Sequence, residues 1–269
     1  MNETGSTYTA VRIGDVSDWR LIAVISETGM TAYLKNIENP ADEIVTLFEE
    51  SWERDSSNLL ERIENAVYDH PQVLDDFSAD IALVAPAAVW VPAEYGDDEE
   101  KCCDIYSAIY PAEAQDVMFE ESAGALCLYS LAPGVLPFLQ RTFPGARCHS
   151  HLGVMAKRFS ERGGDVPCLY VDIRDEEADF VLLDNRHLLL AATHTWKHPS
   201  DIEYKLYNIL NVYGLDPREM QVSLSGLKEV RSELLTSLRR NISCVMLTML
   251  PGIGVKSGMP LAGRLLVRS

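Results

Sequence analysis

The sequence lacks the features of an exported or membrane-spanning chain. Its first residues, Met1 to Thr4, have neither the basic start nor the apolar block of a secretory signal. The longest apolar runs, such as 188–192, fall far short of the ~20 residues that a membrane-spanning helix requires. We therefore expect a cytoplasmic protein with no membrane insertion.

Basic residues are scarce in this chain of 269 residues. Lysine and arginine number 23 against 41 acidic residues, which gives a formal net charge of −18, and no segment gathers a basic stripe. Binding to a phosphate backbone needs clustered cations, so we expect no nucleic-acid partner. The apolar fraction of 47% and the charged fraction of 24% are average for globular proteins, which predicts a largely folded chain.

Motifs for metal binding and hydrolysis are also missing. The six cysteines form no CxxC pair, and several lie in apolar runs, which is typical of reduced core thiols. The chain contains neither a Gly-x-Ser-x-Gly elbow nor a Gly-x-x-x-x-Gly-Lys-Ser/Thr loop. The group Cys148-His149-Ser150-His151 is rich in metal-capable side chains but lacks the ligand spacing of a zinc site. The sequence therefore predicts no metal site and no catalytic residue.

What the sequence does contain is a regular succession of strands and helices in its last hundred residues. Three short apolar runs separated by polar turns predict an antiparallel meander at 168–173, 179–183 and 187–192. Helix and strand then alternate, with helices at 200–213 and 227–238 and strands at 220–224 and 242–247. Ser200 and Glu203 have the spacing of a capping box at the start of the first helix. The predicted order is βββαβαβ.

The first half has a looser form of the same pattern. A hairpin at 21–25 and 30–34 opens it, although a third strand is less evident. Asp55 or Ser56 can cap the helix that follows. Further apolar patterns predict strands at 81–84, 89–91 and 125–131 and helices at 59–67, 97–110, 134–143 and 152–159. Because Gly163-Gly164-Asp165 makes a natural linker, we predict an N-terminal domain of residues 1–162 and a C-terminal domain of 163–269.

Two successive units of this kind resemble the ribonuclease H-like duplication of actin, sugar kinases and the Hsp70 chaperones. The most specific part is the run Leu-Tyr-Val-Asp-Ile at 169–173, which resembles the second phosphate-binding hairpin of that superfamily. The chain is similar to a bacterial family of unknown function within this fold group, with pilus-assembly PilM and cell-division FtsA as better understood relatives. The resemblance implies an α/β fold of two ribonuclease H-like lobes with mixed sheets, as in the actin-like ATPases.

The sequence departs from the superfamily at the phosphate-binding turns. Those turns use Asp-x-Gly followed by Thr or Ser, so that backbone amides can close around phosphate oxygens. Here Asp172 and Ile173 match, but Arg174 replaces the glycine and the carboxylates of 175–177 follow, which would repel a polyphosphate. In the first half, the turn 26–29 lacks the aspartate that would hold hydrated magnesium.

The counterpart of the adenosine-binding segment is equally reduced. Leu224-Ser225-Gly226-Leu227 keeps one glycine of the usual pair, and such a glycine also serves as a tight connection between strand and helix. If a nucleotide binds, the resemblance places it near Asp172, Ser225 and Gly226. ATP and magnesium are expected as cofactors in that case alone, and otherwise we expect none.

Two functional hypotheses follow. The first is a non-catalytic interaction or assembly module that engages a protein partner through an acidic interlobe cleft or an exposed strand edge. Trp90, Tyr95 and Trp196 lie near predicted strand ends and are of the residue types enriched at interfaces. The alternative is an ATP-dependent enzyme, either an ATPase or a small-molecule kinase, with an altered interlobe site. The sequence leaves the oligomeric state, the partner and the pathway open.

Overall fold

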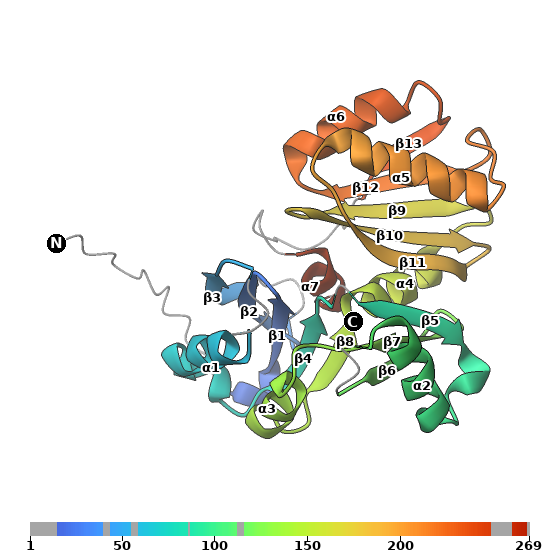
Figure 1. Cartoon of the computed structure of the whole chain (residues 1–269). Coiled ribbons are helices and arrows are strands. Elements are labelled where there is room, and N and C mark those ends of the chain that lie inside the picture. The colour runs from blue at the N-terminus through green and yellow to red at the C-terminus, as the bar shows by residue number, and fades with distance from the viewer. Residues whose placement is uncertain are drawn as a thin grey trace.

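The chain folds into two lobes, each built around a five-stranded mixed sheet (Figure 1). The computed structural model describes residues 15–39, 44–54, 59–85, 87–111, 116–248 and 260–267. The predicted helix cap at Asp55 or Ser56 lies outside the described residues. No helix in these ranges combines the length and the apolar character that a membrane span requires.

The sheet of the N-terminal lobe has the strand order β3-β2-β1-β4-β8. Its strands are β1 (Trp19–Ser26), β2 (Gly29–Asn36), β3 (Val45–Ser51), β4 (Ser78–Leu83) and β8 (Arg147–Ser150). The first three pair antiparallel, whereas β4 and β8 run parallel to β1. The predicted hairpin is present, and β3 supplies the third strand that was less evident in the sequence. Among the residues of β3, Phe48 alone is fully buried, so apolar alternation is weak there.

The sheet of the C-terminal lobe repeats this arrangement. Its strands are β9 (Cys168–Ile173), β10 (Glu177–Asp184), β11 (His187–Thr195), β12 (Gln221–Gly226) and β13 (Cys244–Leu247), in the order β11-β10-β9-β12-β13. Helix α5 (Pro199–Val212) precedes β12, and helix α6 (Lys228–Leu238) follows it. The first three strands again pair antiparallel and the last two run parallel to β9. Strands and helices therefore follow one another as βββαβαβ.

The start of α5 differs from the prediction. Ser200 and Glu203 do not form its capping box, because the helix begins at Pro199 with His198 as its N-cap. The carboxylate of Asp201 accepts hydrogen bonds from the backbone N–H groups of His198 (2.9 Å) and Lys197 (3.0 Å). Proline suits the first helical position because its fixed φ is helical and no N–H is needed there, so the cap lies one residue before it.

A smaller third sheet is inserted between β4 and β8. Its strands are β5 (Ala88–Pro92), β6 (Met118–Ser122) and β7 (Ala125–Tyr129), paired antiparallel in the order β5-β7-β6. Helix α2 (Glu99–Ile109) covers it, and Cys102 and Tyr106 of that helix belong to one buried cluster with Val91. The sequence did not predict β6, where two glutamates interrupt the apolar pattern, or the polar strand β8.

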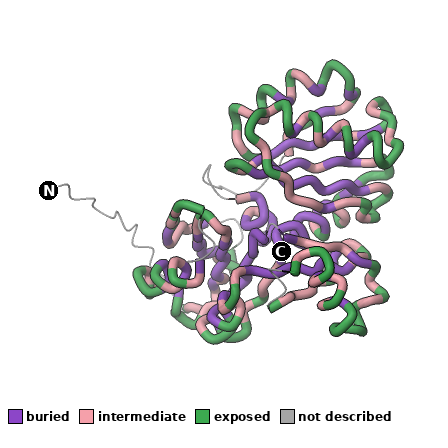
Figure 2. Tube along the Cα trace, in the orientation of Figure 1, coloured by how far each residue is buried: buried purple, intermediate pink, exposed green. Residues whose placement is uncertain are grey.

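Helices form layers outside and between the two large sheets (Figure 1). Helices α1 (Leu59–Asp69) and α3 (Val135–Thr142) cover the outer face of the N-terminal sheet, and α5 and α6 cover that of the C-terminal sheet. Between the sheets lie α4 (His151–Arg162) and α7 (Leu261–Leu266). Buried residues run through these layers in both lobes (Figure 2). Although α7 follows the strands of the C-terminal lobe, it packs against β1 and β4.

Candidate interlobe site

A cleft of about 800 Å³ lies between the lobes at the place that the resemblance indicated. On the N-terminal side it is lined by the β1–β2 turn and by the end of β3 with Arg54. The C-terminal side contributes the β9–β10 turn and the start of α6, and α7 adds Pro260, Leu261 and Arg264. Both hairpins that would face a phosphate chain therefore line the same cavity.

The cleft is not the acidic surface that the first hypothesis expected. Six acidic residues line it: Glu27, Glu49, Glu50, Asp172, Asp175 and Glu177. Five basic residues accompany them: Arg54, Arg174, Lys228, Arg231 and Arg264. These cations come from segments that are far apart in the sequence, so the sequence contains no basic run that would predict them. They come together only in the folded chain.

Arg174, which stands where a glycine was expected, folds back over its own hairpin. Its Nε and Nη2 atoms donate to the two carboxylate oxygens of Asp179 at 2.9 and 2.8 Å, and its Nη1 donates to Glu177 at 2.9 Å. Both carboxylates are buried. Burial alone would raise the pKa of Asp179, but the charges of Arg174 and His151 outweigh it and hold that pKa far below its usual range.

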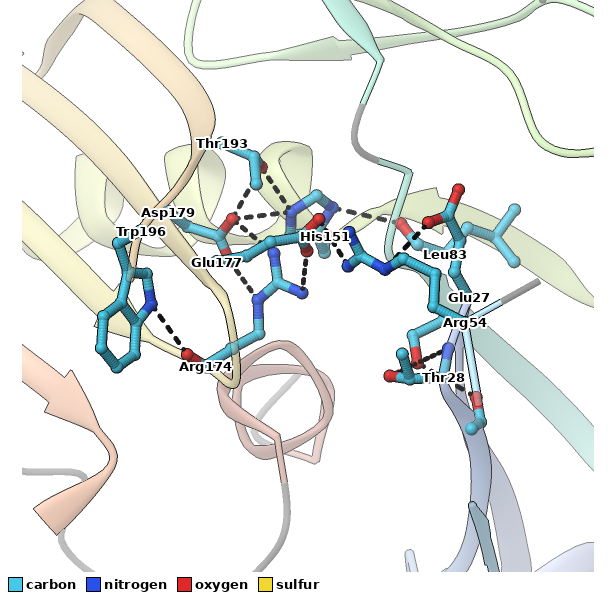
Figure 3. A network of polar contacts seen from close by, with 12 residues as sticks. Glu27, Thr28, Arg54, Leu83, His151, Arg174, Glu177, Asp179, Thr193 and Trp196 are labelled. Carbon is cyan, nitrogen blue, oxygen red and sulfur yellow. Dashed lines mark hydrogen bonds and ion pairs between the residues drawn. The ribbon is translucent and has the colours of Figure 1, made fainter. Parts of the chain in front are cut away.

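A chain of polar contacts crosses from one lobe to the other (Figure 3). Arg54 donates through Nη2 to Glu177 at 2.7 Å, and its Nε lies 3.4 Å from the carboxylate of Glu27 in the opposite hairpin. His151, at the start of α4, lies with Nε2 3.1 Å from Asp179 and with Nδ1 3.3 Å from the carbonyl oxygen of Leu83. The two hairpins are thus joined by ion pairs.

The structure brings Asp172, Ser225 and Gly226 together at the neighbouring ends of β9 and β12. The hydroxyl of Ser225 donates to the carboxylate of Asp172 at 2.7 Å. Gly226 has a φ of +89°, and a Cβ atom there would lie 2.0 Å from the carbonyl oxygen of Ile173, so close backbone approach requires glycine. Burial, together with the charge of Asp179, raises the pKa of Asp172 to about 6. The close approach of the two strand ends therefore explains why residue 226 is a glycine, without any role in ligand binding.

In each lobe a tryptophan donates hydrogen bonds to the hairpin turn, a feature that the sequence did not predict. Trp52 directly follows β3, and it donates its indole N–H to the carbonyl oxygen of Glu27 and its backbone N–H to that of Thr28, both at 2.9 Å. Trp196 directly follows β11 and donates in the same way to Arg174 at 3.0 Å and to Glu176 at 2.9 Å. The shared position after the third strand of each unit was the available signal.

The cluster from Cys148 to His151 serves several structural roles. His149 lies with Nδ1 2.7 Å from Glu120 and with Nε2 3.4 Å from Asp80. Ser150 caps α4 by accepting from the backbone N–H of Gly153. In the described ranges, no three His, Cys, Asp or Glu side chains are arranged to hold a metal ion.

The comparison with protein families identifies the relationship. The model of DUF3822, a family of proteins of unknown function, matches residues 24–245. The chain belongs to the DUF3822 family. Its predicted relationship to a family of unknown function is thereby confirmed, while no curated protein sequence matches the DUF3822 chain.

Solved structures show the fold of the DUF3822 chain. A protein of unknown function with an actin-like ATPase fold from Bacteroides thetaiotaomicron VPI-5482 superposes with a TM-score of 0.80 at 18% identity, covering 94% of this chain and 97% of that chain. PilM, in the PilM–PilN type IV pilus biogenesis complex, gives 0.57 at 13% identity, with 92% and 96% covered. The predicted actin-like α/β fold is confirmed, and the likeness to FtsA stays a prediction.

Proposed function

We propose that the DUF3822 chain is a non-catalytic actin-like module that engages a protein partner and does not turn over ATP. The ion pairs at the hairpins carry this proposal. A phosphate-binding turn needs backbone amides that a phosphate can approach. Here the side chain of Arg174 is held over the turn by Asp179 and Glu177, and Arg54 reaches Glu177 from the other lobe.

Electrostatics also disfavour a triphosphate at this point. A phosphate that drew Arg174 or Arg54 away would leave Glu177 or Asp179 buried without its cation, and breaking such buried pairs costs about 3–5 kcal/mol. Asp175 lines the same cleft and adds repulsion. The hairpins therefore favour a closed, ion-paired state over nucleotide binding.

A protein partner is in keeping with the fold. PilM, which has a similar fold, was solved in a complex with PilN of type IV pilus biogenesis. At 13% identity the likeness extends to the fold alone, so the partner of the DUF3822 chain is part of the proposal.

The alternative is an ATP-dependent enzyme, either an ATPase or a small-molecule kinase. The observation that favours it is that Asp172 and Gly226 line the cleft, with the hydroxyl of Ser225 bonded to Asp172. A buried aspartate with a raised pKa in a cavity is typical of functional sites. ATP and magnesium would be the cofactors of such an enzyme.

Thermal unfolding with nucleotide separates the two functions. The melting temperature is measured with Mg²⁺ and ATP, with Mg²⁺ and pyrophosphate, and with ATP and EDTA. An enzyme should show stabilisation that requires both adenosine and magnesium, of about 2.7 kcal/mol at one hundred times the dissociation constant. We expect no such difference between the three conditions.

The outcome that contradicts the proposal is a shift with Mg²⁺ and ATP alone. In that case Asp172→Asn should abolish the shift, whereas Asp216→Asn, in an exposed turn away from the cleft, should keep it. The same samples are assayed for phosphate release, which the proposal expects to stay at the level of a blank.

The partner is sought by affinity purification from the native host, followed by reconstitution from the purified components. We expect a complex of defined stoichiometry that forms again after separation. If no recovered protein rebinds the purified DUF3822 chain, the assembly role is wrong.

A further inference from the structure

Two arginines that line the cleft each have a buried Nε atom without a hydrogen-bond partner in the part of the chain that the structure describes. They are Arg231 on α6 and Arg264 on α7, and the Nε atom of each is buried. Within the described ranges neither side chain makes a hydrogen bond or an ion pair, in contrast to Arg54 and Arg174 in the same cleft. Buried donors in folded proteins are almost always paired, so two unpaired Nε–H groups of arginines that line one cavity indicate a site for an acceptor.

The two arginines come from opposite sides of the cleft. Helix α6 packs on the C-terminal sheet through Leu234 and Leu238, whereas α7 packs on β1 and β4 of the N-terminal lobe. A ligand held by both side chains would therefore contact both lobes. Its binding free energy would add to the interlobe ion pairs at the hairpins.

The two segments that carry these arginines contribute no carboxylate to the cleft. The lining residues that 227–231 and 260–264 contribute are basic or apolar: Leu227, Lys228, Arg231, Pro260, Leu261 and Arg264. Lys228 is exposed and lies three residues before Arg231, so both point from the same face of α6. The carboxylates of the cleft belong to the strands and hairpins.

We infer that the cleft binds a small carboxylate or phosphate anion between Arg231 and Arg264. The planar guanidinium group matches both oxyanions with paired hydrogen bonds. The site needs neither adenosine nor magnesium and does not involve the hairpin turns. The anion site therefore does not depend on the proposed protein partner, and it stands even if no such partner is found.

Calorimetric titration tests the site with sodium phosphate and with sodium citrate at matched ionic strength. The proteins are the unchanged chain, Arg231→Gln, Arg264→Gln and the double variant. We expect saturable binding of at least one anion, weakened about tenfold or more by each glutamine because a charged hydrogen bond is lost. Phosphate binding alone identifies a phosphate ligand, and citrate binding alone a carboxylate ligand.

Arg218→Gln is the matched control, because Arg218 is exposed and does not line the cleft. It should bind the anion as the unchanged chain does. Both anions also stabilise proteins by exclusion from their surfaces, so the difference between variants, measured as affinity, is the test. Thermal unfolding without anion shows whether each variant is folded. If one of the two glutamine variants does not fold, the affinity of the other tests the inference.

Equal affinity in all variants, or no saturable binding of either anion, would overturn the inference. A shift that requires adenosine and magnesium would instead contradict the proposed function and leave the arginine site standing. The two proposals can therefore fail separately.

Discussion

Asp172 shows how a residue taken from a motif acquires a different physical setting in the folded chain. Its carboxyl group is buried, faces the charge of Asp179 and has the hydroxyl of Ser225 as a donor. Burial and the neighbouring carboxylate outweigh the hydrogen bond, which raises the pKa to about 6. The ionised form is therefore held at a cost to stability.

Replacing Asp172 by asparagine should relieve that cost. Because the folded-state pKa lies above the unfolded value near 4, stability should fall as pH rises from about 4 to about 6, by no more than about 3 kcal/mol. We expect Asp172→Asn to lack this decline and to be at least as stable as the unchanged chain at neutral pH. Urea unfolding across this pH range measures it, and a less stable variant at neutral pH would contradict the assignment.

Among the elements, the two hairpins at the cleft are built alike although their sequences differ. After each hairpin comes one further strand, and the tryptophan that directly follows this strand binds the hairpin turn through its indole and backbone N–H groups. The two halves of the fold thus support their hairpins in the same way.

Removing either indole N–H should weaken its hairpin. Trp196→Phe and Trp52→Phe each leave a carbonyl oxygen without its donor, and we expect a loss of about 1–2 kcal/mol of unfolding free energy in each. Trp90→Phe is the control, because the buried Nε1 of Trp90 has no partner within the described ranges. It should lose less than the other two in chemical denaturation. Equal losses in all three would show that ring volume, rather than the hydrogen bond, matters.

For the molecule as a whole, charged contacts join parts that are distant in the chain. His149 on β8 lies between Asp80 on β4 and Glu120 on β6, so it links the inserted sheet to the N-terminal sheet. Burial lowers the pKa of His149, but the hydrogen bonds and charges of the two carboxylates outweigh burial and raise it to about 9. The imidazolium is therefore a cation that holds two carboxylates at neutral pH.

This contact predicts a loss of stability in alkali. A histidine with a raised folded-state pKa contributes fully below its unfolded value near 6.5, and the contribution is lost as pH rises through about 9. Because the ring is partly exposed, we expect the unfolding free energy to fall by about 1–2 kcal/mol over this range. The variant His149→Gln should not show this pH dependence. Urea unfolding between these pH values measures the loss. If NMR shows that the imidazole of His149 titrates near its ordinary pKa, the prediction is wrong.

The order of elements in the C-terminal lobe could be predicted from the sequence, because apolar periodicity and turn residues act over a few neighbours. The same reasoning missed β3, β6 and β8, whose polar residues break the alternation. It also missed α7 and shifted the start of α5, where proline rather than serine sets the cap.

The chemistry of the cleft was decided by tertiary structure. Arg54 and Glu177 are 123 residues apart, and Arg231 and Arg264 line the same cleft because α7 returns to the N-terminal lobe. The first hypothesis named an acidic interlobe cleft or an exposed strand edge, and the packing of the lobes gathers scattered arginines among the carboxylates of that cleft. Local patterns determine which face of an element is buried, but charge pairing depends on which elements the lobes bring together, and that is set by long-range packing of the two sheets around α4 and α7.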